Sequence, residues 1–305
     1  MTYCPGRLCI PFGLQCNLHC KYCYRDICRK DIPTHATSAF LDYVSSLPKD
    51  TYAIIASGGE PLCNWQEVIK VFESAPVYIH KKIMTNGSLL NKDIVDYIND
   101  NDIEVHLSYD GNMSQYLRGY DVLDDKLPLI RKIHNLRILS VITNRNTDVL
   151  QVYKEIKSKL QRPFYFSHSV VVDTSTNQPL INRFDYDTYE RSLCELLVSE
   201  DKLPTEWYHN KKPSRLGFNY LLDGSVVGIH TLNKYGSVWD DEETLLNNFY
   251  KIENTRKCLD RNCYIRDICG QDYANASDHM CHIEKIRQNV FAMLNNGGTG
   301  QYVRA

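Results

Sequence analysis

The first half of the chain alternates short apolar runs with amphipathic stretches. Strands that alternate with helices of about 10–15 residues indicate βαβ units around a parallel sheet, which is an α/β fold. Six such units are too few for a closed eight-stranded barrel, so we predict a partial (βα)6 barrel. The predicted strands cover residues 8–12, 52–56, 77–83, 103–107, 138–142 and 164–167, and the predicted helices between them cover residues 36–46, 65–74, 91–99, 122–134 and 147–160.

The second half of the chain follows a different pattern. Asp223-Gly224 lies between two apolar runs, which predicts a β-hairpin with a type I′ turn. The cysteine-rich stretch 258–281 has weak periodicity, as expected where a metal rather than an apolar core fixes the backbone. We therefore predict a small C-terminal cysteine-rich extension made of a hairpin and a helix. The predicted boundaries are 1–200 for the barrel, 201–305 for the extension, 218–222 and 225–229 for the hairpin strands, 184–200 and 282–295 for further helices, and 201–215 for a linker.

Composition and charge narrow the class of protein. Hydrophobic residues make up 43% and charged residues 24%, an ordinary globular balance. The 35 basic and 37 acidic residues give a net charge of −2, which argues against extended nucleic-acid binding. The chain has no run of about 18 apolar residues, and its first residues lack the layout of a signal peptide. We therefore expect a cytoplasmic protein that has no membrane partner.

The cysteines are unevenly distributed. The chain has 12 of them, with six in the first 28 residues and four in the last 48. Cysteines that cluster at short spacings in a reducing compartment are usually metal ligands rather than disulfide partners. The two clusters therefore indicate two metal sites.

The first cluster is Cys16-Asn-Leu-His-Cys20-Lys-Tyr-Cys23, directly after the first predicted strand. Three thiolates on one loop can converge on an iron–sulfur cluster and leave one iron open. An open coordination position lets a metal bind a substrate or a second cofactor. Zinc is the alternative, and it requires a fourth ligand. Candidates for that ligand are His19, Cys28 and Cys9.

The spacing Cys-x3-Cys-x-aromatic-Cys after a first strand resembles the radical S-adenosylmethionine (SAM) superfamily. In that family, three cysteines hold a [4Fe-4S] cluster whose open iron chelates the amino and carboxylate groups of SAM. An electron from the cluster cleaves SAM to methionine and a 5′-deoxyadenosyl radical, which takes a hydrogen atom from the substrate. The resemblance implies that Cys16, Cys20 and Cys23 are the cluster ligands. It also implies an electron donor such as flavodoxin or ferredoxin.

Polar segments after the later strands resemble the same family in the same order. They are Ser-Gly-Gly-Glu-Pro at 57–61, Thr-Asn-Gly at 85–87, Ser-Tyr-Asp-Gly at 108–111 and Thr-Asn at 143–144. Polar residues at the carboxyl ends of barrel strands are where an active site is expected. The resemblance covers about residues 7–170. It implies that SAM is contacted by Tyr22, Gly58, Gly59, Glu60, Pro61, Thr85, Asn86, Ser108, Asp110, Arg118, Thr143 and Asn144.

Individual roles follow from the same resemblance. Tyr22 contacts the adenine, and the two glycines bring the backbone close to the SAM amino group. Ser108 and Arg118 hold the methionine carboxylate, and the pair at 143–144 faces the ribose. Asp110 has a second interpretation, because it could cap the turn before Gly111.

The second cluster comprises four cysteines at spacings x4, x5 and x11, enough to complete a metal site without other ligands. Next to a radical SAM core, this pattern and the preceding hairpin resemble the SPASM/twitch extension, which carries auxiliary iron–sulfur clusters. Structural zinc is the alternative. The implied ligands of the auxiliary [4Fe-4S] cluster are Cys258, Cys263, Cys269 and Cys281.

The chain departs from the full extension, which has enough cysteines for two clusters. Three positions that hold cysteine in the family are occupied here by Ile229 or His230, by Asp241 and by Tyr273. All three belong to one cluster in the family. We therefore expect a single auxiliary cluster, with His230 as an optional extra ligand.

No catalytic acid or base is evident. Cys63 follows the Gly-Gly-Glu-Pro segment closely, and it is either a reactive thiol or a packed one. Asp241 and Glu242 occupy the region where peptide-modifying relatives place a proton acceptor, but they also belong to a solvated acidic run.

Three functions remain open at this stage. The first is a radical SAM enzyme that abstracts a hydrogen atom from a peptide or protein side chain. The second is the same chemistry on a nucleotide, a nucleic-acid base or another small molecule, because the chain shows no added peptide-recognition domain. The third is a zinc-binding module without catalysis, which metal analysis would distinguish from the other two.

Overall fold

A computed structural model describes residues 6–23, 31–171, 177–199, 218–228, 232–253 and 278–295. All six predicted barrel strands are present within about three residues of their predicted ends. The strands are β1 (Arg7–Pro11), β2 (Ala53–Ser57), β3 (His80–Thr85), β4 (Glu104–Ser108), β5 (Leu136–Ile142), β6 (Tyr165–Val170), β7 (Phe218–Tyr220), β8 (Ser225–Gly228) and β9 (Lys234–Ser237).

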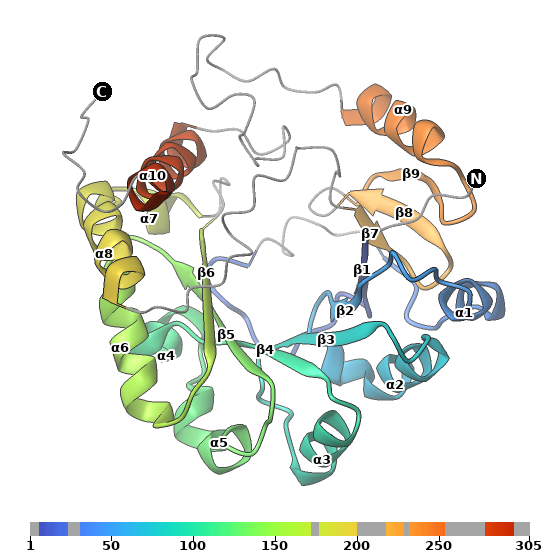
Figure 1. Cartoon of the computed structure of the whole chain (residues 1–305), viewed down its shortest axis with the longest axis horizontal. Coiled ribbons are helices and arrows are strands. Elements are labelled where there is room, and N and C mark those ends of the chain that lie inside the picture. Colours follow the sequence, from blue (N-terminus) through green and yellow to red (C-terminus); the bar gives the residue numbers. More distant parts are fainter. Residues whose placement is uncertain are drawn as a thin grey trace.

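The strands form one nine-stranded sheet in the order β6-β5-β4-β3-β2-β1-β7-β8-β9. Strands β1 to β6 pair in parallel with their neighbours, so their carboxyl ends lie along one edge. The sheet curves around a central space and stays open between β6 and β9 (Figure 1). This confirms the predicted partial barrel.

The helices that connect the barrel strands lie outside the curved sheet, as Figure 1 shows for α1, α2, α3, α5 and α6. Side chains cap several of their first turns, for example Thr37 at α1 and Asn91 at α3. The helices are α1 (Ser38–Ser45), η2 (Pro61–Asn64), α2 (Trp65–Ser74), α3 (Lys92–Asp100), η3 (Gly111–Met113), α4 (Ser114–Arg118), α5 (Val122–Ile130), α6 (Val149–Leu160), α7 (Gln178–Ile181), α8 (Tyr186–Ser199), α9 (Glu242–Glu253) and α10 (Asp278–Asn295).

The hydrophobic core fills the layer between the sheet and these helices. Alternate residues of β1, Leu8 and Ile10, are fully buried, and so are Phe40 of α1 and Phe72 of α2. This alternation turns the other side chains of each strand toward the inside of the barrel. The core therefore fixes which strand residues face the central space.

The extension continues the barrel sheet. β7 pairs in parallel with β1 through Asn219 and Cys9, and β7 and β8 form the predicted antiparallel hairpin. The predicted type I′ turn is wrong, because in the described structure only Gly224 of the turn has a positive φ, at 84°, while Asp223 does not. The amide of Gly224 instead donates to the carbonyl of Leu221, which makes a turn that ends in a left-handed glycine.

Two elements of the extension were not predicted from the sequence, β9 and α9. Asp241 caps α9 by accepting from the amide of Thr244, and the helix buries Leu245 and Phe249. The last helix, α10, starts at Asp278, four residues before its predicted start, and lies beside α8 (Figure 1). None of the described helices is long and apolar enough to cross a membrane.

Candidate active site

The structure brings the polar segments of the sequence together at the carboxyl edge of the sheet. The loop of Cys16, Cys20 and Cys23 follows β1, the Gly-Gly-Glu-Pro segment follows β2, and Thr85 ends β3. Ser108 ends β4, and Thr143 follows β5. The cysteine loop therefore lies in one array with the residues predicted to contact SAM.

Backbone hydrogen bonds join the cysteine loop to the glycine segment. The amide of Gly59 donates to the carbonyl of Gly13 at 2.9 Å, and the amide of Glu60 donates to the carbonyl of Gln15 at 2.8 Å. A Cβ on Gly59 would lie 1.9 Å from the Gln15 oxygen. Gly58 has a φ of 107°, which favours glycine. Glycine is therefore required at both positions, because the cysteine loop lies directly against the backbone of residues 58–59.

Glu60 links the ends of β2 and β3. Its carboxylate is buried and accepts hydrogen bonds from the amide of Leu62 at 3.1 Å, the hydroxyl of Thr85 at 2.6 Å and the amide of Asn86 at 2.7 Å. Buried carboxylates need such donors to remain charged. Glu60 and Thr85 thus have structural partners in addition to the SAM contacts predicted for them.

Asn86 connects this network to the first cysteine. Its side-chain nitrogen lies 3.7 Å from the Sγ of Cys16 and 3.1 Å from the side-chain oxygen of Asn17. The amide of Leu18 approaches the same sulfur at 3.5 Å. The side chain of Asn86 therefore connects the Cys16 sulfur to the end of β3.

Asp110 is the centre of a second network. Its fully buried carboxylate accepts from the Nε and Nη2 of Arg118 at 2.8 and 3.0 Å, from the hydroxyl of Tyr22 at 2.5 Å and from the amide of Val141 at 2.7 Å. Within the described structure its side chain does not cap η3, so the turn-cap interpretation is wrong. Asp110 joins the cysteine loop, α4 and β5.

Burial and charge set the protonation states in this network. Burial raises the pKa of Tyr22 well above its usual value, so its hydroxyl stays protonated and can donate. Burial opposes the charge of Arg118, but the Asp110 carboxylate outweighs this and raises the Arg118 pKa. Arg118 also lies 5.4 Å from the centre of the Tyr22 ring. The cation of Arg118 therefore persists beside the cysteine loop.

The three thiols lie close enough to affect one another. Burial raises the pKa of Cys20, Arg118 lowers it, and the neighbouring thiolates of Cys23 and Cys16 raise it further. In the described parts of the chain, no three His, Cys, Asp or Glu side chains converge at the distances of a single metal ion. A [4Fe-4S] cluster does not need such convergence, because each thiolate binds a different iron. Three half-buried thiols on one loop fit that donor set.

The side chain of Asn144, predicted to face the ribose of SAM, has partners within the protein. Its side-chain nitrogen donates to the carbonyls of Pro179 and Asn182 at 3.0 and 2.7 Å. The neighbouring Thr143 hydroxyl donates to the side chain of Asn146 at 2.9 Å. Asn144 therefore fixes α7 against the end of β5, and the contacts of both residues with SAM stay predictions.

The predicted catalytic candidates lie in different parts of the fold. Cys63 is half-buried in η2, which begins at Pro61. Asp241 and Glu242 are exposed at the start of α9. The backbone hydrogen bond from Thr244 lowers the pKa of Asp241, so helix capping accounts for this residue. The catalytic roles of these three residues stay predictions.

The second cysteine cluster is only partly described. Cys281 is half-buried on α10. That helix is held against α8 by a 2.7 Å hydrogen bond between Tyr186 and His279 and by stacking of Tyr186 on His282. The other predicted residues lie outside the described residues: Cys258, Cys263, Cys269 and His230.

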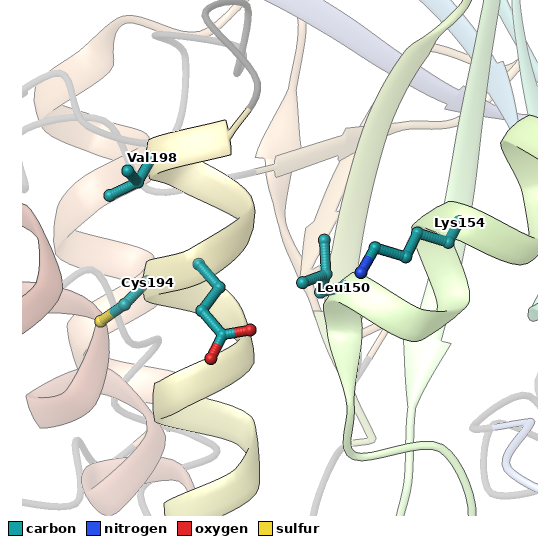
Figure 2. Close-up of a pocket in the computed structure, with 5 residues that line it drawn as sticks. Leu150, Lys154, Cys194 and Val198 are labelled. Atoms are coloured by element: carbon teal, nitrogen blue, oxygen red, sulfur yellow. The ribbon is translucent and has the colours of Figure 1, made fainter.

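A cavity of about 440 Å³ lies outside the barrel. It is lined by Leu150 and Lys154 from α6 and by Cys194 and Val198 from α8 (Figure 2), together with Glu195. It contains no residue of the predicted site.

The sequence missed two residues that hold the cysteine loop. Asn17 bridges Asn86 and the hydroxyl of Ser88, and Asn177 donates to the carbonyl of Tyr22 at 3.3 Å. Asn17 lies inside the cysteine motif, where a polar side chain was a usable signal. Asn177 is 155 residues from Tyr22, and no local pattern indicates their contact.

Comparison with known proteins identifies the family. The model of the radical SAM superfamily matches residues 10–158. The chain is 32% identical over 249 residues to an uncharacterised protein of Methanocaldococcus jannaschii. The matched region covers 74% of this chain and 80% of that protein. The chain belongs to the radical SAM superfamily and is an enzyme. Membership implies SAM and a [4Fe-4S] cluster as cofactors.

The chain also resembles a further enzyme in sequence and two solved structures in fold. It is 24% identical over 216 residues to a cysteine-type anaerobic sulfatase-maturating enzyme of Clostridium novyi, covering 61% of this chain and 58% of the enzyme. The structure of anSMEcpe with bound AdoMet matches with a TM-score of 0.70 at 19% identity, covering 95% of this chain and 97% of that chain. SuiB of Streptococcus suis bound to S-adenosylmethionine matches with a TM-score of 0.63 at 15% identity, over 91% of this chain and 77% of that chain.

Proposed function

We propose that this radical SAM enzyme takes a hydrogen atom from a peptide or protein side chain. One observation carries the proposal: the fold is shared, over most of the chain, with two proteins whose structures hold peptides. These are anSMEcpe with the Cp18Cys peptide, with a TM-score of 0.67 over 95% of this chain, and SuiB with its precursor peptide SuiA, with a TM-score of 0.62 over 91% of this chain.

We further propose that Cys16, Cys20 and Cys23 hold the [4Fe-4S] cluster and leave one iron open for SAM. When bound, the cluster supplies the electron that cleaves SAM to methionine and a 5′-deoxyadenosyl radical. The donor set supports this role, because the described part of the loop provides the three thiols of Cys16, Cys20 and Cys23.

The surrounding residues hold this loop in one conformation. Asn86, fixed by Glu60, directs its amide at the Cys16 sulfur. On the other side, Asp110 fixes Tyr22, which lies between Cys20 and Cys23 in the sequence. Preorganised ligands on rigid elements avoid a cost of ordering when the cofactor binds.

Arg118 adds a positive charge beside the loop. Burial raises the pKa of the Cys20 thiol, and the charge of Arg118 offsets part of that rise. A cluster with three thiolates is anionic, and the guanidinium offsets part of that charge in a buried setting. That Arg118 and Ser108 also receive the carboxylate of SAM stays a prediction.

For the extension we propose one auxiliary [4Fe-4S] cluster held by Cys258, Cys263, Cys269 and Cys281. The docking of α10 on α8 supports it, since the contacts of Tyr186 fix the helix that carries Cys281. Four cysteine ligands leave no open iron, so the cluster would stabilise the extension and carry electrons.

The substrate class can be tested by isotope transfer. The enzyme's native cells are grown in deuterated medium, and their extract is separated into a peptide and protein fraction and a small-molecule fraction. Each fraction is incubated with reduced enzyme and unlabelled SAM, and the deuterium content of 5′-deoxyadenosine is measured. We expect deuterium only with the peptide and protein fraction, and we expect a non-specific protease to abolish the signal.

Deuterium transfer from the small-molecule fraction alone would refute the peptide proposal and favour a nucleotide or another small molecule. The control is the variant in which Cys16, Cys20 and Cys23 are all replaced by Ala, which should give no 5′-deoxyadenosine with either fraction.

A further inference from the structure

A cluster of charged side chains lies on three neighbouring strands of the barrel. The carboxylate of Glu104 on β4 lies 3.0 Å from the Nζ of Lys82 on β3 and accepts from the Nε of Arg137 on β5 at 2.9 Å. The Nε2 of His106, on the same strand as Glu104, lies 2.9 Å from that carboxylate. We call Lys82, Glu104, His106 and Arg137 the inner cluster.

The side chains of the inner cluster face the central space of the barrel. The next residues along the three strands, Ile83, Val105 and Ile138, are fully buried in the core between the sheet and the helices. Successive side chains of a strand point to opposite faces, so the inner cluster lies on the other face. Met84 and Tyr165 share that inner face and are 36% and 55% exposed. Solvent therefore reaches the inner face beside the cluster.

Positive charge exceeds negative charge on this inner face. In the inner cluster, the cations of Lys82 and Arg137 outnumber the single carboxylate of Glu104. Glu104 is the only acidic residue in strands β1 to β6, so these strands supply no second carboxylate to the inner face. A partly buried face with this charge is complementary to an anionic group. One further carboxylate would match the two cations of the inner cluster.

Arg137 is held in an orientation that suits a carboxylate. Its Nη1 donates to the hydroxyl of Ser167 at 3.1 Å, and its guanidinium lies 5.2 Å from the centre of the Tyr165 ring. A guanidinium presents its donors in a planar fork, which matches the two oxygens of a carboxylate. Because its neighbours already fix this group, less conformational freedom is lost when it binds a ligand.

The inner cluster lies below the predicted SAM contacts. Glu104, His106 and Ser108 share one face of β4, and Ser108 ends the strand. Each residue of a strand spans about 3.3 Å, so along the strand His106 lies about 7 Å and Glu104 about 13 Å from Ser108. An extended peptide covers these distances in about two to four residues. A peptide that reacts beside SAM can therefore also reach the inner cluster.

We propose that the inner cluster binds a carboxylate of the substrate peptide, located about two to four residues from the carbon that loses its hydrogen atom. Lys82 and Arg137 donate to this carboxylate, and Glu104 holds the two cations on either side of it. The group belongs to an acidic side chain or to the end of the peptide chain. The inference rests on the proposed peptide function and adds to it the chemistry by which the peptide is recognised.

The first experiment blocks the carboxylates of the substrate. The deuterated peptide and protein fraction is divided into untreated, methyl-esterified and amine-acetylated portions, and each is incubated with reduced enzyme and unlabelled SAM. We expect esterification to slow deuterium transfer to 5′-deoxyadenosine about tenfold, the loss expected for a charge-assisted hydrogen bond. Hydrolysis of the esters with mild base should restore the rate, and acetylation should leave it unchanged. Carboxypeptidase should slow the transfer only if the carboxylate is that of the chain end.

The second experiment changes the inner cluster. Lys82→Met removes one cation and should raise about tenfold the amount of peptide fraction that gives half-maximal deuterium transfer. Glu104→Gln removes a competing negative charge and should lower that amount. With the esterified fraction, Lys82→Met and the wild type should require nearly equal amounts, because the group that the lysine binds has lost its charge.

The matched control is Lys81→Met, which removes a lysine from the same strand. The side chain of Lys81 lies on the opposite face of β3, where it interacts with Glu73 of α2. This variant should require the same amount of peptide fraction as the wild type.

Four outcomes would overturn the inference. Equal transfer from the untreated and esterified portions would show that no carboxylate is recognised, and loss of transfer after phosphatase treatment would assign the inner cluster to a phosphate group. Parallel losses of transfer in Lys82→Met and Glu104→Gln, with equal losses of melting temperature, would limit the inner cluster to stabilising the barrel. The fourth is an equal loss in the Lys81→Met control. Absence of transfer from the untreated portion would instead refute the proposed peptide function, on which the inference rests.

Discussion

Replacing Asp110 by Asn tests how the cysteine loop is held. The side chain keeps its size but loses its charge, while Arg118 keeps its own. Asp110 is fully buried and Arg118 is 7% exposed, so the guanidinium is left without its counterion in a medium of low polarity. Removing one partner of a buried ion pair typically destabilises a protein by about 3–5 kcal/mol. The loss falls on the contacts that join the loop to α4 and β5.

The assay is urea denaturation of the metal-free chain, with unfolding monitored by circular dichroism. A matched control is Asp96→Asn, which breaks an ion pair between Lys92 and Asp96 on the surface of α3, where both side chains are largely exposed. Exposed pairs contribute less than about 1 kcal/mol, so the control should unfold at nearly the wild-type urea concentration.

A second variant separates the charge from the packing. In Asp110→Asn/Arg118→Met neither charge remains, so part of the lost stability should return, because an apolar replacement of a buried pair is often tolerated. If Asp110→Asn is destabilised no more than Asp96→Asn, the claim that Asp110 organises the site is wrong.

Three further predictions concern the site, the barrel interior and the extension. Gly59→Ala places a Cβ against the Gln15 carbonyl and should destabilise the chain by more than about 2 kcal/mol in thermal denaturation, whereas Gly119→Ala, with open space around it, should lose less; equal losses would contradict the loop contact. Burial opposes the charge of Glu104, but hydrogen bonds from its basic neighbours lower its pKa, so its stabilising effect is present above the unfolded-state pKa of about 4.3 and is lost as the pH falls. The stability difference between the wild type and Glu104→Gln should therefore shrink between pH 7 and pH 3, and a constant difference would refute this. Cys263→Ala should lower the iron content of the reconstituted chain from about eight to about four per chain and leave SAM cleavage without substrate intact; loss of that cleavage in a folded barrel would show that the auxiliary site takes part in the core chemistry.

The strands of the barrel could be predicted because each is a local pattern. Apolar runs such as residues 53–56 stand between amphipathic helices, and their alternation determines a parallel sheet. Strand β9 could not be predicted, since Lys-Tyr-Gly-Ser has one buried side chain, that of Tyr235, and depends on pairing with β8. Helix α9 left a usable signal in the cap Asp241 and the spacing of Leu245 and Phe249.

In the candidate site, too, local patterns could be predicted and contacts between distant residues could not. The cysteine spacing drew attention to the loop after β1, because its three thiols lie close together in the sequence. The roles of Asp110 and Gly59 were not predictable, because their partners lie far away in the chain. Val141 is 31 residues from Asp110, and Gly59 meets a carbonyl 44 residues earlier, at Gln15. Only the register of the sheet brings these groups together.

The most direct test of the central claim compares the wild type with the variant in which Cys16, Cys20 and Cys23 are all replaced by Ala. Both are reconstituted anaerobically with iron and sulfide, reduced with dithionite and given SAM without substrate. The account predicts that the wild type forms 5′-deoxyadenosine, and that the variant forms none and holds about four fewer irons per chain while its barrel stays folded. Continued formation of 5′-deoxyadenosine by the triple variant would contradict the account.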